Sequence, residues 1–288
     1  MRNSKPSLLA LFSRALKRLF ADEAIPLAGN FAFRMIFSLF PFLIFLTALA
    51  GFIGTEEMVK RIVTTLLSVA PENLVRPFAA EIRSILTVPR TGLLSLAALL
   101  TVWSAMGGVD SVRIGLNRAY GVVETRPLWL LLLINLVFVF GGAVLLLVFS
   151  GLLVVIPAVE DLINAYAPQW EIHFNTLAPY RVPLAVLMLF ASLWIAHRFL
   201  PNLRLRPYDV LPGIIVTVIV WVAVTVGFAW YLSHFNSFSA TYASLSGVFA
   251  SMFLIYLAGL ALIFGGEMNR VLMIIRETRG HPDEATGG

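Results

Sequence analysis

The sequence contains no cysteine and few charged residues. Without thiols, the 288-residue chain cannot form disulfides, thiolate metal sites, iron–sulfur clusters or cysteine nucleophiles. Charged residues make up 13% of the chain, whereas a soluble domain carries about 25%. Hydrophobic residues reach 59%, with a mean hydropathy of +0.88. The composition therefore predicts an integral membrane protein, because lipid must solvate much of such a surface.

Residue patterns that hold metal ions or phosphate groups are also missing from the sequence. The 4 histidines and 16 acidic residues are scattered, and no HxH, HExxH, DxD, P-loop or GxSxG pattern occurs. We therefore expect no catalytic residues, no metal and no cofactor. The net charge is +5. We expect no nucleic-acid partner, because the basic residues lie between apolar runs and fit the positive-inside bias of membrane proteins.

Six apolar segments predict an all-α polytopic membrane protein, a six-transmembrane-helix bundle with amphipathic interfacial helices. A membrane-spanning helix needs about 20 predominantly apolar residues. No convincing cleavable signal peptide precedes the first segment. We expect one integral membrane domain over residues 1–276 and a disordered cytoplasmic tail over 277–288. The predicted spans are residues 31–53, 91–109, 128–156, 182–199, 210–232 and 245–265.

Two other segments have an amphipathic helical pattern. Residues 7–20 place leucines and Phe12 on one face, and Arg14, Lys17 and Arg18 on the other. This pattern predicts a helix in the headgroup plane of an anionic leaflet, and packing on the protein itself is the alternative. Residues 54–90 carry too many charges for a span, so they predict a helical outer loop that lies on the membrane or caps the bundle.

The distribution of Lys and Arg predicts the orientation of the spans. With six spans and the N-terminus inside, the inner segments hold more than twice as many basic residues as the outer ones. We therefore expect both termini in the cytoplasm. Residues 233–244 are polar but uncharged, so they fit either a simple loop or a re-entrant segment.

The densest polar constellation on an apolar run is formed by Asp110, Arg113 and Asn117. Their i, i+3, i+7 spacing places them on one face of a helix. Ionisable groups inside a membrane bundle mark substrate or ion paths, and an Arg beside a carboxylate suits an anionic headgroup. These three residues are therefore the first candidates for a substrate contact. The alternative is a local salt bridge that closes the bundle.

Arg34 and Glu267 are the second candidates for a substrate contact. Arg34 lies near the start of the first predicted span, where it fits either an anion contact at a cavity mouth or snorkelling to the interface. Glu267 ends the sixth predicted span, and its structural alternative is a pair with Arg270. Asp209 fits an N-cap of the fifth span.

Four stretches of the sequence form an ordered set of motifs. They are SLFPFLIFLTALAGFIG (38–54), WSAMGG with LNRAYG (103–121), YDVLPG (208–213) and GGEMNR (265–270). Together they resemble the YihY/BrkB family of bacterial inner-membrane proteins, formerly mislabelled ribonuclease BN. The resemblance extends over about residues 20–275 and implies six transmembrane helices, a location in the bacterial inner (plasma) membrane, a role in serum resistance or envelope integrity, and suspected transport.

These observations favour transport or flipping of a lipid-like or anionic solute through a polar cavity. The alternative is a non-transporting membrane scaffold for envelope integrity, with a packed and dry interior. We expect membrane lipids as partners in both cases. Enzyme activity, including ribonuclease activity, is not expected, because a metal-dependent nuclease needs clustered carboxylates or histidines.

Overall fold

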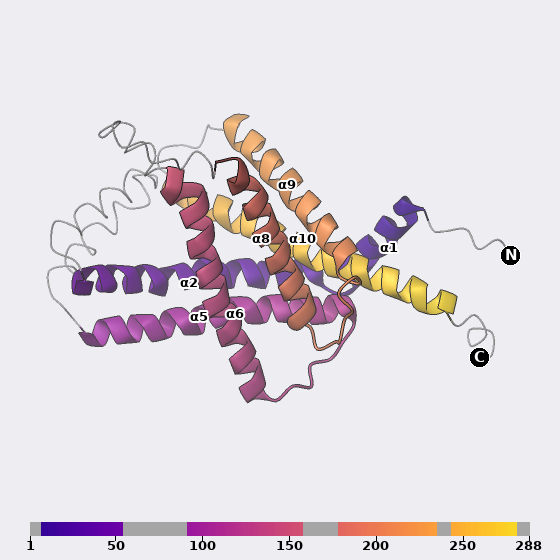
Figure 1. Cartoon of the computed structure of the whole chain (residues 1–288), viewed down its shortest axis with the longest axis horizontal. Coiled ribbons are helices and arrows are strands. Elements are labelled where there is room, and N and C mark those ends of the chain that lie inside the picture. Colours follow the sequence, from indigo (N-terminus) through magenta and orange to yellow (C-terminus); the bar gives the residue numbers. More distant parts are fainter. Residues whose placement is uncertain (1–6, 54–90, 158–177, 235–242, 281–288) are drawn as a thin grey trace.

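The described residues of the computed structural model are 7–53, 91–157, 178–234 and 243–280, and their regular elements are all helices (Figure 1). A π-helical turn, Gly151–Val155, directly continues one of them, α6. The helices are α1 (Leu8–Ala21), α2 (Ala24–Ile53), α5 (Thr91–Tyr120), α6 (Leu128–Ser150), α8 (Ala178–Phe199), α9 (Leu211–His234) and α10 (Ala243–Gly280).

Six of these helices are long and apolar enough to cross a membrane. This confirms the predicted all-α polytopic architecture with six spans. Many of their large apolar side chains are exposed, as expected for helices whose neighbours are lipid tails. The candidate spans are Ala24–Phe45, Ser95–Tyr120, Leu128–Leu153, Pro179–Phe199, Leu211–Tyr231 and Gly247–Thr278.

Three helices extend well beyond the predicted spans. Helix α2 begins at Ala24, seven residues before the predicted span, and α5 continues for eleven residues past it to Tyr120. Helix α10 runs on to Gly280, so residues 277–280, predicted as tail, are its last turn. A helix satisfies its own backbone hydrogen bonds whatever its side chains are, so it continues where apolar residues give way to polar ones.

Several predicted segments lie outside the described residues. These are the helical outer loop 54–90, residues 281–288 of the tail, and the loop 233–244 apart from its first two and last two positions. The division into one membrane domain and a tail stays a prediction.

Helices α2 and α5 pack against each other along their lengths in antiparallel directions (Figure 1). Helix α10 packs against both of them and against α9, while α6 crosses α5 and contacts it. Helix α1 lies against α10 at the end of the bundle where α2 begins and α5 ends. The polar groups at the ends of α1, α5 and α10 are therefore brought together at this end of the bundle.

Glycines allow three of these helix contacts to be unusually close. Gly213 of α9 lies directly against Gly265 of α10, where neither helix has a side chain to separate the backbones. On α5, Gly108 and Gly115 lie against Met35 and Ile263, so these two glycines accommodate neighbouring helices. Small residues at helix contacts are typical of membrane bundles, because they let dispersion contacts form along the whole interface.

Candidate functional site

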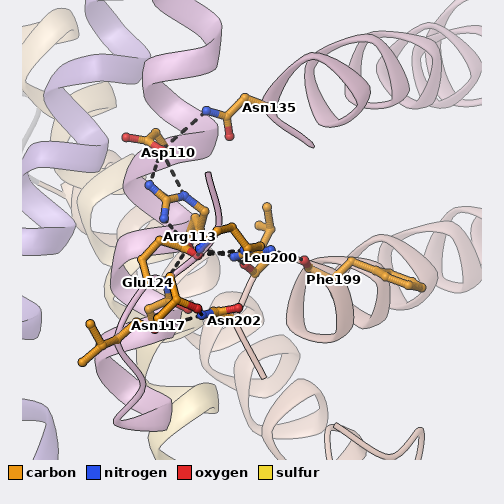
Figure 2. A network of polar contacts seen from close by, with 11 residues as sticks. Asp110, Arg113, Asn117, Glu124, Asn135, Phe199, Leu200 and Asn202 are labelled. Atoms are coloured by element: carbon orange, nitrogen blue, oxygen red, sulfur yellow. Dashed lines mark hydrogen bonds and ion pairs between the residues drawn. The ribbon is translucent and has the colours of Figure 1, made fainter. Parts of the chain in front are cut away.

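Three of the five predicted site residues lie in one polar network. Asp110, Arg113 and Asn117 project from one face of α5 toward the loops that follow α5 and α8 (Figure 2). Arg34 on α2 and Glu267 on α10 belong to two separate clusters.

Arg113 is held between two carboxylates. Its Nε and Nη2 donate to Asp110 Oδ1 at 3.0 and 2.6 Å, and its Nη1 donates to Glu124 of the loop after α5. The Arg113 side chain is 7% exposed, so these ion pairs replace most of its hydration. Removing either acid would leave part of a buried guanidinium without a counter-charge.

Glu124 is the centre of the network, and the sequence analysis missed it. Its carboxylate also accepts hydrogen bonds from Asn117 Nδ2 at 3.1 Å and from Arg126 Nε and Nη2, both at 2.8 Å. The same Arg126 reaches the loop after α8, where its Nη2 donates to the Leu200 carbonyl at 2.6 Å. Glu124 therefore holds the loop 121–127 to α5, and Arg126 holds the same loop to the end of α8.

Asn202 completes the connection between the two loops. Its backbone N–H donates to Asn117 Oδ1 at 2.7 Å, and its side-chain amide donates to the Val123 carbonyl and to Thr125 Oγ1 at 2.9 and 2.8 Å. The charges of the network cancel, since two acids face two arginines. This part of the site is a closed clamp that holds the ends of α5 and α8 together.

Acid should weaken this clamp. The Arg126 guanidinium holds the pKa of the Glu124 carboxyl at about 2, well below its usual 4.5. The stabilisation that depends on the Glu124 charge is therefore complete above the unfolded-state pKa and is lost as the pH falls toward 2. We expect the free energy of unfolding to fall by about 1–2 kcal/mol between pH 5 and pH 3, because solvent partly screens the group.

The measurement is unfolding in mixed micelles at several pH values, for the wild type and for Glu124→Gln. The variant should be less stable at pH 5 and should show a shallower pH dependence. Identical pH dependences would mean that other carboxyls cause the acid sensitivity.

On one side, the network contacts α6 through a single long hydrogen bond. Asn135 Nδ2 lies 3.5 Å from Asp110 Oδ1, at the limit of a hydrogen bond, and Figure 2 shows the Asn135 amide directed toward this carboxylate. Asn135 Oδ1 is buried without a hydrogen-bond partner among the described residues. The contact between α5 and α6 therefore retains hydrogen-bonding capacity that no described residue uses.

Arg34 has only neutral partners among the described residues. Its Nε donates to Asn30 Oδ1 at 3.2 Å and its Nη1 donates to the Gly107 carbonyl at 3.3 Å. A Cβ at Gly107 would lie 2.8 Å from Nη1, so this glycine makes room for the guanidinium. Arg34 is the eleventh residue of the span candidate that begins at Ala24, about 15 Å along the helix axis. The guanidinium thus lies within a candidate span and has three N–H donors left over.

Glu267 lies in a third cluster, beneath α1. Its side chain is completely buried, and its Oε2 accepts from Arg18 Nε at 2.7 Å. Arg18 also donates to Asp22 at 3.0 Å and to the Ala119 carbonyl at 3.3 Å. The sequence-based alternative, a pair with Arg270, is wrong. The physical reason is that Glu267 is buried against Arg18 of α1, whereas the Arg270 guanidinium pairs with Glu277 at 3.7 Å.

A fully buried network links α5, α8 and α10, and sequence reasoning missed it as well. The Tyr120 hydroxyl lies 3.0 Å from His197 Nδ1 and accepts from Asn269 Nδ2 at 3.0 Å. Asn269 Oδ1 accepts from the Gly213 backbone N–H at 2.6 Å. These polar residues lie within apolar stretches of the sequence, and only the fold shows which of them meet.

Asp209, interpreted above as an N-cap, instead accepts a hydrogen bond from Arg276 at 2.6 Å.

Within the part of the chain that the structure describes, no group of three His, Asp or Glu side chains is close enough to hold a metal ion.

The six apolar helices define a polytopic α-helical membrane protein. A family model described as "Virulence factor BrkB" matches residues 15–286, and the chain belongs to this family. The resemblance found in the sequence is thereby confirmed.

Several curated relatives are similar over most of their length. "Putative ribonuclease-like protein YfkH" of Bacillus subtilis is 29% identical, over 93% of this chain and 98% of that protein. "UPF0761 membrane protein" of Pseudoalteromonas atlantica is 21% identical, over 86% of this chain and 80% of that protein. "UPF0761 membrane protein PSHAa0171" of Pseudoalteromonas translucida is 22% identical, over 88% and 82%. No solved structure matches the chain significantly.

Proposed function

We propose that this BrkB-family membrane protein transports or flips a lipid-like or anionic solute across a bacterial inner membrane. The observation that supports this proposal is that Arg34, within a candidate span, has only neutral partners among the described residues. A charged side chain at membrane depth is costly and usually marks a substrate or ion pathway. Arg34 has no acidic partner among the described residues, so its positive charge is available to an anion.

The chemistry of the guanidinium indicates the class of solute. Two of its five N–H donors are used by Asn30 and Gly107, and the others suit a carboxylate or phosphate, which accept two parallel hydrogen bonds. The surrounding exposed side chains of α2, such as Phe33 and Phe37, are apolar. An amphiphile with an anionic headgroup matches both features.

Asp110, Arg113, Asn117 and Glu267 stay candidates for further polar contacts. Among them, Asp110 is the strongest candidate for an additional hydrogen bond to a solute. Its side chain is 29% exposed, and it lies beside Asn135 Oδ1, which has no hydrogen-bond partner among the described residues. Arg113 is already balanced by two acids, so its role in the proposal is to position Asp110.

The orientation of the chain is part of the proposal. Several basic residues outside or at the ends of the spans lie at the end of the bundle that holds α1, as expected for the cytoplasmic side. We therefore place both termini in the cytoplasm. These residues include Arg14, Lys17, Arg118, Arg126, Arg206 and Arg276.

The closed clamp around Glu124 favours a second candidate function, a membrane scaffold without transport. All its charges are neutralised by protein groups, as a purely structural element requires. The name of the Bacillus subtilis relative includes "ribonuclease-like", but we infer that this chain is not an enzyme. That assignment stays a prediction.

Replacing Arg34 should remove an anionic ligand from the purified protein. A charge-assisted hydrogen-bonded pair contributes about 1.5–3 kcal/mol, so Arg34→Gln should retain about 10- to 100-fold less of a specific anionic lipid or solute. Arg34→Lys should keep part of it. The measurement is mass spectrometry of the molecules that co-purify in mild detergent, normalised to protein.

Arg118→Gln is the matched control, because Arg118 is 56% exposed and pairs only with the exposed Glu23 among the described residues. It should retain the same ligand as the wild type. If the wild type and Arg34→Gln carry the same bulk membrane lipid, the transport proposal loses its support and the scaffold gains it. Thermal unfolding of each variant separates loss of ligand from loss of fold.

A further inference from the structure

One face of α1 is fixed against the bundle. Ala15 and Leu19 are buried in a core cluster with residues of α2 and α10, and the rings of Phe12 and Phe264 meet edge to face at 5.2 Å. The ion pair between Arg18 and Glu267 anchors the same side. These contacts set the rotation of α1 about its axis, so the directions of its other side chains are defined.

A second face of α1 is apolar and exposed. Leu9, Leu16 and Phe20 are 82%, 38% and 60% exposed. At about 100° per residue, their directions lie within about 40° of one another and about 100° from the buried face. Only two residues separate the end of α1 from the start of α2, a candidate span. The exposed apolar face therefore lies close in the chain to the start of a candidate span.

The third face is basic and has no counter-charge among the residues that the structure describes. Arg14 and Lys17 are exposed, and neither forms an ion pair within the described part of the chain. Helix α1 contains no acidic residue of its own. Arg18, its third basic residue, is neutralised by Glu267 and Asp22. Two positive charges thus remain beside the apolar face.

From these three faces we infer that α1 is a binding site for anionic phospholipid headgroups in the leaflet on the side of the N-terminus. Leu9, Leu16 and Phe20 enter the acyl region, while Arg14 and Lys17 contact the phosphates. An apolar face beside a basic one is the arrangement of helices that lie in the plane of an anionic leaflet. The inference is independent of transport, since none of the five side chains proposed to contact the lipid is a candidate contact of the solute.

The absence of cysteine from the chain makes the test direct, because each introduced cysteine is a single labelling site. Phe20→Cys on the apolar face and Ala21→Cys on the basic face differ by one position, and both sites are exposed. Each variant is labelled with an environment-sensitive fluorophore and reconstituted in nanodiscs. We expect lipid-borne quenchers to act on position 20 and aqueous iodide to act on position 21. Equal accessibility of both labels to iodide would overturn membrane binding by α1.

The charge dependence is tested with two lipid compositions, phosphatidylcholine alone and phosphatidylcholine with phosphatidylglycerol. Each basic residue near an anionic surface strengthens binding about fivefold, so the lipid quenching of position 20 should increase with phosphatidylglycerol at low salt. The double variant Arg14→Gln/Lys17→Gln should lose this increase. If the quenching is the same in both compositions, α1 does not recognise anionic headgroups. A matching thermal unfolding temperature shows that the double variant is folded.

Discussion

Gly213→Ala should destabilise the folded protein by about 3 kcal/mol, at the upper end of the cost of overpacking. A Cβ at this position would collide with the backbone carbonyl oxygen of Gly265 and would lie 2.5 Å from Asn269 Nδ2. A backbone atom cannot rotate away as the end of a side chain can. The methyl group therefore has to separate α9 from α10, and it also disturbs the bond from the Gly213 N–H to Asn269.

The loss should extend beyond one helix contact, because Asn269 also donates to Tyr120 and to the Val210 carbonyl. Separating α9 from α10 thus strains a buried network that includes α5. These groups are buried, so water cannot replace a broken bond at low cost. This coupling places the expected effect at the upper end of the range.

Gly227→Ala is the matched control, because Gly227 lies on the same helix and a Cβ there would meet nothing within 4 Å. It should change stability by less than about 1 kcal/mol, since alanine is the better helix former. The measurement is the free energy of unfolding in detergent with increasing SDS. Equal effects of the two substitutions would mean that backbone flexibility, and not close packing, determines the cost at Gly213.

The six spans could be predicted from the sequence because each depends only on local composition. The shared face of Asp110, Arg113 and Asn117 could be predicted for the same reason, since helical periodicity relates residues a few positions apart. The extent of α2 and α10 could not be predicted from hydropathy. Polar residues end an apolar run without ending the helix.

The partners of the site residues could not be predicted, because they come from distant parts of the chain. Arg18 and Glu267 are 249 positions apart, and Tyr120 and Asn269 are 149 apart. Glu124 is close in sequence to Arg113, but a turn at Gly121, with φ of +67°, carries the chain back along α5. The sequence signal for Glu124 was a charged residue directly after a helix, and such residues are usually solvated.

Arg18→Ala should destabilise the protein by about 3 kcal/mol, the cost of leaving a buried charge without its partner. The Glu267 side chain is completely buried, and one of its two carboxylate oxygens already lacks a hydrogen-bond partner among the described residues. Removing Arg18 leaves the other oxygen without its ion pair. It also releases Asp22 and the Ala119 carbonyl, so the contact of α1 with both α5 and α10 is weakened.

A double-mutant cycle tests this account against simple loss of packing. In Glu267→Gln the buried group is neutral, so the Arg18→Ala/Glu267→Gln double variant should be more stable than Arg18→Ala alone. Lys17→Ala, one position away and exposed, should change stability by less than about 0.5 kcal/mol. If the double variant is instead the least stable of the set, Arg18 acts through its alkyl chain and its other hydrogen bonds. The charge of Glu267 would then not be what holds α1 to the bundle.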